Sequence, residues 1–244
     1  MRRVLSRYGF ACAYLACFML TELVYAGLSP DGQARLTAWA STSVVNLEHE
    51  PAGPLVVSAF VSPGSPLTWL ALIALAVFGA NRALGNARTA LVCLAGQVIG
   101  SLLSEGIVAY RVNAGQLPAA DRYITDVGPS YVVVSAIVIA VLCGSWLARA
   151  LALADLAVLV FAGDIFGGLS QLDVAAVGHL TAMLTATAAT VLIMTRRGRG
   201  STDGGHPRSA GHVADRHADQ VGDRDGEGPQ DQLPEGTAPE RPVG

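Results

Sequence analysis

Six stretches of about 20 largely apolar residues run through the chain, and they limit what it can fold into. A helix needs roughly 20 apolar residues to cross the hydrocarbon core of a bilayer. Hydrophobic residues make up 52% of the sequence and charged residues only 14%, well below the charged share of a soluble domain. We therefore predict an all-α membrane protein with about six transmembrane helices, near residues 9–28, 55–80, 88–110, 128–147, 149–168 and 174–194.

Two boundaries in this series can be drawn in more than one place. Gly64 and Pro66 interrupt the second stretch, so its membrane helix can instead begin near Pro66. Residues 54–63 then form a short interfacial or re-entrant piece. Almost no sequence separates the fourth and fifth stretches, where Gly144, Ser145 and Arg149 indicate a tight helical hairpin.

Arginine bias predicts the orientation of the six helices. With the N-terminus in the cytoplasm, the inner side carries nine arginines: Arg2, Arg3, Arg7, Arg82, Arg88, Arg149, Arg196, Arg197 and Arg199. The outer side carries three, namely Arg35, Arg111 and Arg122. Positive residues are retained on the cytoplasmic side of membrane proteins. We therefore expect a multi-pass protein of the cell membrane with both termini in the cytoplasm.

The first apolar stretch has a second interpretation. Three arginines precede it, and it ends in Val24-Tyr25-Ala26, so the pattern also resembles a secretory signal peptide. Cleavage would leave five helices and an outer N-terminus. The length of the stretch and the presence of Glu22 within it favour a membrane helix.

The chain changes character after residue 197. Nine of its 19 acidic residues follow Gly200, and large apolar side chains are nearly absent there. Such a segment cannot bury enough surface to offset its ordering entropy. We predict a transmembrane domain over residues 1–197 and a disordered, polar cytoplasmic tail over 198–244. The tail histidines (His206, His212 and His217) offer at most adventitious metal binding.

Neither a cofactor nor a nucleic-acid partner is predicted. Cys12, Cys17, Cys93 and Cys143 lie in apolar stretches, at spacings that match neither a disulfide framework nor a metal site. No basic patch with interleaved aromatic residues is present. The predicted partners are the lipid bilayer and transmembrane segments of other proteins, and the sequence leaves the oligomeric state open.

Ionisable side chains inside membrane helices are costly and mark functional sites by default. Glu22, Glu105, Asp155 and His179 lie within the predicted helices. One hypothesis is a small transporter in which Glu105 and Asp155 relay protons. The chain shows no internal repeat or pair of broken helices, which disfavours this hypothesis.

Ser130 and His179 form a more specific pair. Ser130 opens the fourth apolar stretch and His179 lies early in the sixth, and both stretches run from outside to inside. They precede Arg149 and Arg196 by 19 and 17 residues, which correspond to about 28 Å and about 26 Å of helix. At matching depth, the histidine can act as base for a serine nucleophile.

Each residue of the pair also has a purely structural interpretation. Pro129 and Ser130 suit the first turn of a helix, with Ser130 or Asp126 as a cap. His179 alone suits a buried hydrogen bond between helices.

The layout resembles the rhomboid family of intramembrane serine proteases from about Ser41 to Met194. Gly128-Pro129-Ser130 is similar to the first three positions of the family's Gly-x-Ser-Gly motif at the head of the fourth helix. Gly178-His179-Leu180 resembles the histidine segment of the sixth helix, and residues 41–51 resemble an actinobacterial subgroup. The resemblance implies a six-helix bundle, a Ser130 nucleophile and a His179 base, without a metal or organic cofactor.

Departures from the family pattern leave two functions open. Tyr131 stands where the motif has its second glycine, and residues 67–72 lack the histidine and asparagine that serve as oxyanion donors. Gly128 with the local backbone, and the hydroxyl of Thr68, are the remaining candidates for an oxyanion site. The chain is then either a serine protease that cleaves transmembrane segments or a catalytically inactive relative that binds them.

Overall fold

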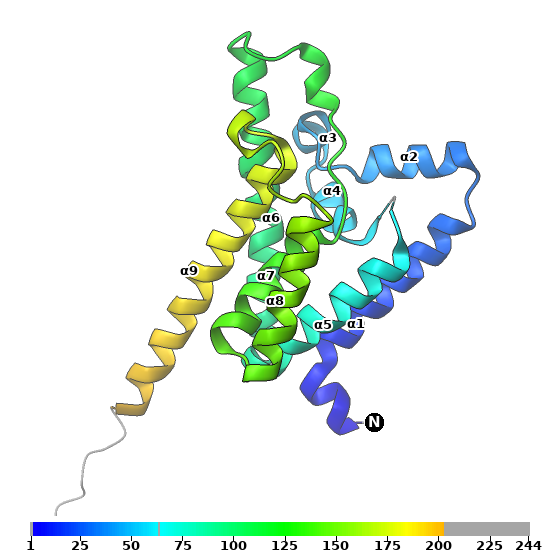
Figure 1. Ribbon diagram of the computed structural model, residues 1–244. Coiled ribbons are helices and arrows are strands. Elements are labelled where there is room, and N and C mark those ends of the chain that lie inside the picture. Colours follow the sequence, from blue (N-terminus) through cyan, green and yellow to red (C-terminus); the bar gives the residue numbers. More distant parts are fainter. Residues whose placement is uncertain (1, 63, 203–244) are drawn as a thin grey trace, which may run out of the picture. The chain divides into compact units, whose positions relative to one another are not determined.

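A computed structural model describes residues 2–62 and 64–202 of the chain (Figure 1). This part is built from helices and contains no strand. The six long helices are α1 (Arg2–Ala26), α5 (Pro66–Leu84), α6 (Asn86–Asn113), α7 (Ser130–Cys143), α8 (Trp146–Phe161) and α9 (Val174–Thr202). Helix α9 continues through residues 198–202, which the sequence assigns to the disordered tail. The rest of the predicted tail, from residue 203 onward, lies outside the described residues.

The prediction of an all-helical membrane protein with about six membrane helices is confirmed. Four helices are long and apolar enough to cross a bilayer: Ser6–Ala26 within α1, α5, α6, and Val174–Arg196 within α9. The apolar helix α7 has 14 residues and α8 has 16, so they are about 21 Å and about 24 Å long. The second membrane helix begins at Pro66, as the alternative boundary predicts, and Pro66 occupies the first turn, where its missing N–H is harmless.

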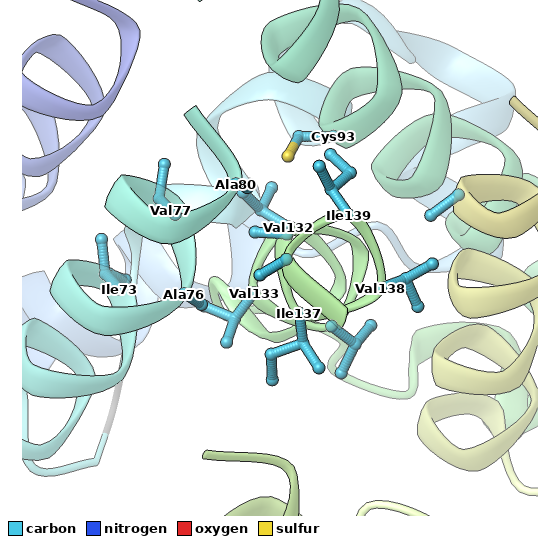
Figure 2. Close-up of a cluster of buried hydrophobic side chains, with 14 of the residues drawn as sticks. Ile73, Ala76, Val77, Ala80, Cys93, Val132, Val133, Ile137, Val138 and Ile139 are labelled. Atoms are coloured by element: carbon cyan, nitrogen blue, oxygen red, sulfur yellow. The ribbon is translucent and has the colours of Figure 1, made fainter. Parts of the chain in front are cut away.

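Helix α7 is the central element of the bundle. All residues from 131 to 140 are buried, so the helix has no solvent-facing or lipid-facing side over this length. It packs against α5, α6, α8 and α9. Figure 2 shows Ala76 and Ala80 of α5 next to Val133 and Val132 of α7. A helix buried on every side reads as uniformly apolar, which explains why its sequence lacks an amphipathic period.

Small residues bring α6, α7 and α9 close together. A Cβ atom at Gly100 of α6 would lie 3.1 Å from the carbonyl oxygen of Gly178 in α9. At Gly96, an added Cβ would overlap the hydroxyl of Ser135 in α7. Close approach through glycine is a common means of packing membrane helices.

The segment between α1 and α5 folds into short helices that cap one end of the bundle. These are α2 (Pro30–Ala40), α3 (Val44–His49), α4 (Ala52–Val57) and a 3₁₀ turn (Ser58–Phe60). The hydroxyl of Tyr14 in α1 donates to the Ala59 carbonyl (2.8 Å), and the Ser62 N–H donates to Glu22 of α1 (3.0 Å). Helix α1 is therefore part of the core, and the segment following it is fixed in place.

Candidate active site at the heads of α7 and α9

Ser130 begins α7, where the sequence places the head of the fourth membrane helix. The preceding Gly128 has φ +140°, a left-handed conformation that favours glycine. Its N–H donates to the Ser58 carbonyl at 2.8 Å, which ties this turn to the segment between α1 and α5. The turn leaves Ser130 half-buried.

His179 lies in the second turn of α9 and is only 5% exposed. Its Nδ1 is 3.0 Å from the carbonyl oxygen of Ile165, in the connection between α8 and α9. Because a carbonyl only accepts, Nδ1 carries the hydrogen, and in a neutral ring Nε2 is then the basic nitrogen. Among the described residues, Nε2 has no hydrogen-bond partner. The imidazole thus has the tautomer of a general base, but it forms no hydrogen bond with Ser130.

Tyr131 fills the space beside the histidine. Its side chain is 3% exposed, and its ring meets the His179 ring edge-on, with centroids 5.0 Å apart. The ring lies so close to Gly178 that any side chain there would overlap it. The heads of α7 and α9 therefore lie side by side, and Tyr131 makes the contact between them.

The Tyr131 hydroxyl donates to Oδ2 of Asp126 at 3.0 Å. The same oxygen accepts from the Thr42 hydroxyl at 2.9 Å, and the Thr42 N–H donates to the Asp126 carbonyl at 3.0 Å. The Asp126 N–H donates to Ser41 Oγ at 2.9 Å. Asp126 thus joins the head of α7 to the segment before α3. The sequence suggests only a helix cap at Asp126, because its partners Ser41 and Thr42 lie more than 80 residues away.

Burial raises the pKa of Asp126 above the usual aspartate range, although the hydrogen bonds from Thr42 and Tyr131 oppose the shift. Its carboxyl group lies in the loop before α7, outside the membrane-spanning helices. Since the folded-state pKa is raised, Asp126 favours the folded state while protonated and loses that contribution as the pH rises through the folded-state value.

We expect the stability of the wild type to fall through Asp126 as the pH rises above about 4, the usual aspartate range, and Asp126→Asn to flatten this slope because asparagine does not titrate. Thermal unfolding in detergent at several pH values measures the slope. Thr42→Val is the matched control, because it removes one hydrogen bond and keeps the carboxyl group. Equal slopes in wild type and Asp126→Asn would contradict the expectation.

The two predicted oxyanion groups, at Thr68 and Gly128, do not form a pair of free hydrogen-bond donors. Thr68 is exposed on the first turn of α5, and the Gly128 N–H is already bonded to Ser58. A buried amide not singled out by the sequence, that of Gln97 in α6, donates to the Ser58 hydroxyl at 3.1 Å. Gln97 is thus connected to the turn before Ser130 through Ser58. The sequence feature that could have identified Gln97 is a polar side chain within an otherwise apolar helix.

The two acids of the transporter hypothesis lie on different helices. Glu105 of α6 is 2% exposed, and neither carboxylate oxygen has a hydrogen-bond partner among the described residues. It borders a cavity of about 180 Å³ with Val44 and Leu47 of α3. Asp155 lies on α8, and α7 packs against both α6 and α8. No described contact connects the two acids into a relay.

In the part of the chain covered by the structure, all four cysteines are free thiols and no group of three potential metal ligands is present. The tail histidines lie outside that part.

A comparison with protein families identifies one that the sequence matches. A family model described as "Rhomboid-like protein" matches residues 7–199, a range that begins within α1, ends within α9 and contains the other four long helices in full. No curated protein and no solved structure matches the chain significantly.

Proposed function

The chain belongs to the rhomboid-like family of membrane proteins, and on this premise we propose that it binds transmembrane segments of other proteins without cleaving them. The observation that carries the proposal is the position of Tyr131. Its ring occupies the space next to His179, and Nε2 of His179 has no partner among the residues described. A nucleophile and its base must come within hydrogen-bond reach before the hydroxyl proton can be transferred.

Missing oxyanion donors support the same proposal. The first turns of α5 present an exposed Thr68 and no histidine or asparagine side chain. Removal of one oxyanion donor lowers a hydrolase rate by about 10²–10³-fold. A binding role needs neither group.

A reactive-serine probe tests the proposal. We expect the folded wild type to show no fluorophosphonate labelling above that of Ser130→Ala. Folding is checked by monodisperse elution in detergent. If the wild type is labelled and both Ser130→Ala and His179→Ala abolish the label, the non-cleaving proposal fails.

That outcome would support the second candidate, an intramembrane serine protease with Ser130 as nucleophile and His179 as base. The tautomer of His179 favours it, because Nδ1 is bonded to the Ile165 carbonyl and Nε2 is left basic. Hydrogen bonds between catalytic groups are often long before a substrate binds.

Binding of transmembrane segments has its own test. Leu67 at the start of α5 and Phe161 at the end of α8 are 76% and 87% exposed. We expect a photo-crosslinking residue at either position to capture the transmembrane segment of another membrane protein in cells. Exposed Leu91 on α6 is the control position. Crosslinks that are equally frequent at all three positions would indicate random collisions.

We also propose a cell-membrane location with both termini in the cytoplasm. Arg7, Arg82, Arg88 and Arg149 lie near the ends of helices that alternate in direction, and the positive-inside rule assigns this end to the cytoplasm. The opposite end would then carry the segment between α1 and α5.

Labelling of single cysteines in intact cells measures this topology. In the full chain with its four native cysteines replaced by alanine, Asp31→Cys should react with a membrane-impermeant maleimide, whereas Arg88→Cys should react only after the membrane is permeabilised. The opposite pattern would reverse the assigned orientation.

A further inference from the structure

A cavity of about 440 Å³ opens between α5 and α8 at the arginine-rich end of the bundle, away from Ser130 and His179. The side chains of α5 and α8 form its two walls, and Tyr8 of α1 closes one side. Tyr8 is held there by its ring contact with Phe78, with centroids 5.7 Å apart. We name this the inner cavity. It is lined by Tyr8, Ala74, Leu75, Phe78, Gly79, Arg82, Ser145, Leu147, Ala148 and Leu151.

The lining of the inner cavity changes from polar to apolar along the helices. Arg82 lies in the last turn of α5, and Ser145 caps the start of α8, so both mark the same end. On α5, Ala74 lies eight residues before Arg82, which corresponds to about 12 Å. On α8, Leu151 lies six residues after Ser145, which corresponds to about 9 Å. A ligand that fits must be polar at one end and apolar at the other.

Among the residues that the structure describes, the positive charge at the polar end has no acidic partner. No Asp or Glu occurs between Glu50 and Glu105 or between Asp126 and Asp155, the two stretches that contain Arg82 and Arg149. The one ion pair in the described part of the chain joins Arg122 to Glu48, far from Arg82 in the sequence. The guanidinium of Arg7 lies over the Tyr8 ring at 5.6 Å. An anion is therefore the expected counterpart.

The neighbouring surface is suited to the headgroup region of a bilayer. Trp146, next to Ser145, is 80% exposed, and exposed tryptophans of membrane proteins collect at the level of the headgroups. Ser145 Oγ accepts the N–H of Ala148, so its own hydrogen remains available to a ligand. Basic pockets between membrane helices at this depth are suited to anionic lipid headgroups.

We propose that the inner cavity binds one anionic glycerophospholipid from the leaflet at the arginine-rich end. Arg82 binds the phosphate, the hydroxyls of Tyr8 and Ser145 donate to its oxygens, and the acyl chain lies along Leu75 and Leu151. A free phosphate would leave the apolar length of the cavity without a partner. The site is independent of any chemistry at Ser130, so the proposal stands whether or not the chain is a protease.

Native mass spectrometry of the full chain, extracted into detergent with phosphatidylglycerol or phosphatidylcholine, tests the proposal. We expect the wild type to retain phosphatidylglycerol in preference to phosphatidylcholine. Arg82→Gln should lower this retention about five-fold, the loss that corresponds to one arginine contact at a membrane surface. Arg88→Gln is the matched control, because Arg88 is an exposed arginine at the same end that does not line the cavity. Equal losses in both variants would show a diffuse basic surface instead of a site, and an absent lipid preference would also overturn the proposal.

A second pair of variants tests the cavity without changing charge. Leu75→Trp fills the inner cavity from its wall, whereas Leu91→Trp adds the same side chain to an exposed position on α6. We expect Leu75→Trp to abolish phosphatidylglycerol retention and Leu91→Trp to leave it unchanged. Undiminished retention in a folded Leu75→Trp protein would show that the lipid binds elsewhere.

Discussion

Replacing Gly178 with alanine should destabilise the folded protein by about 2–4 kcal/mol, because the added methyl group would occupy the space of the Tyr131 ring. Tyr131 cannot retreat easily, since it is buried and its hydroxyl is bonded to Asp126. Either α9 moves away from α7, or the tyrosine moves and loses its hydrogen bond to Asp126. A lower thermal unfolding midpoint in detergent measures the loss.

Gly106→Ala is the matched control for this substitution. Gly106 lies on α6, and an added Cβ there would meet no atom within 4 Å. Alanine is the better helix former, so the control should be neutral or gain up to about 1 kcal/mol. Equal shifts of the unfolding midpoint in the two alanine variants would show that the packing of α7 against α9 does not depend on the close approach at Gly178.

A double substitution shows whether the cost arises from Tyr131. If it does, Gly178→Ala should cost less in a Tyr131→Ala background, with a coupling of about 1 kcal/mol or more between the two positions. Additive effects would place the strain elsewhere, for example at Gly100, whose Cβ position also faces α9.

Hydropathy was sufficient to predict the six long helices, because the ability to cross a bilayer is a local property of about 20 residues. The start of the second helix at Pro66 and the start of α7 at Ser130 both follow from proline chemistry in adjacent residues. Hydropathy does not give the rotation of a helix about its axis. For this reason the exposure of Thr68 was not visible in the sequence.

The polar network around Tyr131 was beyond sequence analysis for a different reason. Thr42 and Asp126 are separated by 84 residues, and their contact depends on how the segment between α1 and α5 folds over the bundle. Hydrogen-bond partners at this separation leave no periodic pattern. The tyrosine itself was visible as a departure from the rhomboid motif, but its neighbours Gly178 and Asp126 become evident only when α7 and α9 are packed.

Replacing Tyr131 with glycine should make Ser130 reactive, because it removes the ring that lies against His179 and restores the residue found in the rhomboid motif. With the base able to approach the hydroxyl, fluorophosphonate labelling should rise to about 100-fold above the Ser130→Ala background, the lower range of a general base contribution. The label should disappear again in Tyr131→Gly combined with Ser130→Ala or His179→Ala.

Tyr131→Phe is the control that separates the two roles of the tyrosine. Phenylalanine keeps the ring beside His179 and loses only the hydrogen bond to Asp126, whose Oδ2 still accepts from Thr42. The variant should therefore remain unlabelled while losing about 1 kcal/mol of stability for that hydrogen bond. Position 131 is the second residue of α7, where a glycine is better tolerated than in the helix interior. If Tyr131→Gly elutes as a folded monodisperse protein and is still not labelled, then the tyrosine ring is not the cause of the low reactivity of Ser130. The missing donors at the start of α5 would then be the dominant cause, because an oxyanion without partners costs about 10²–10³-fold in rate even when nucleophile and base are aligned.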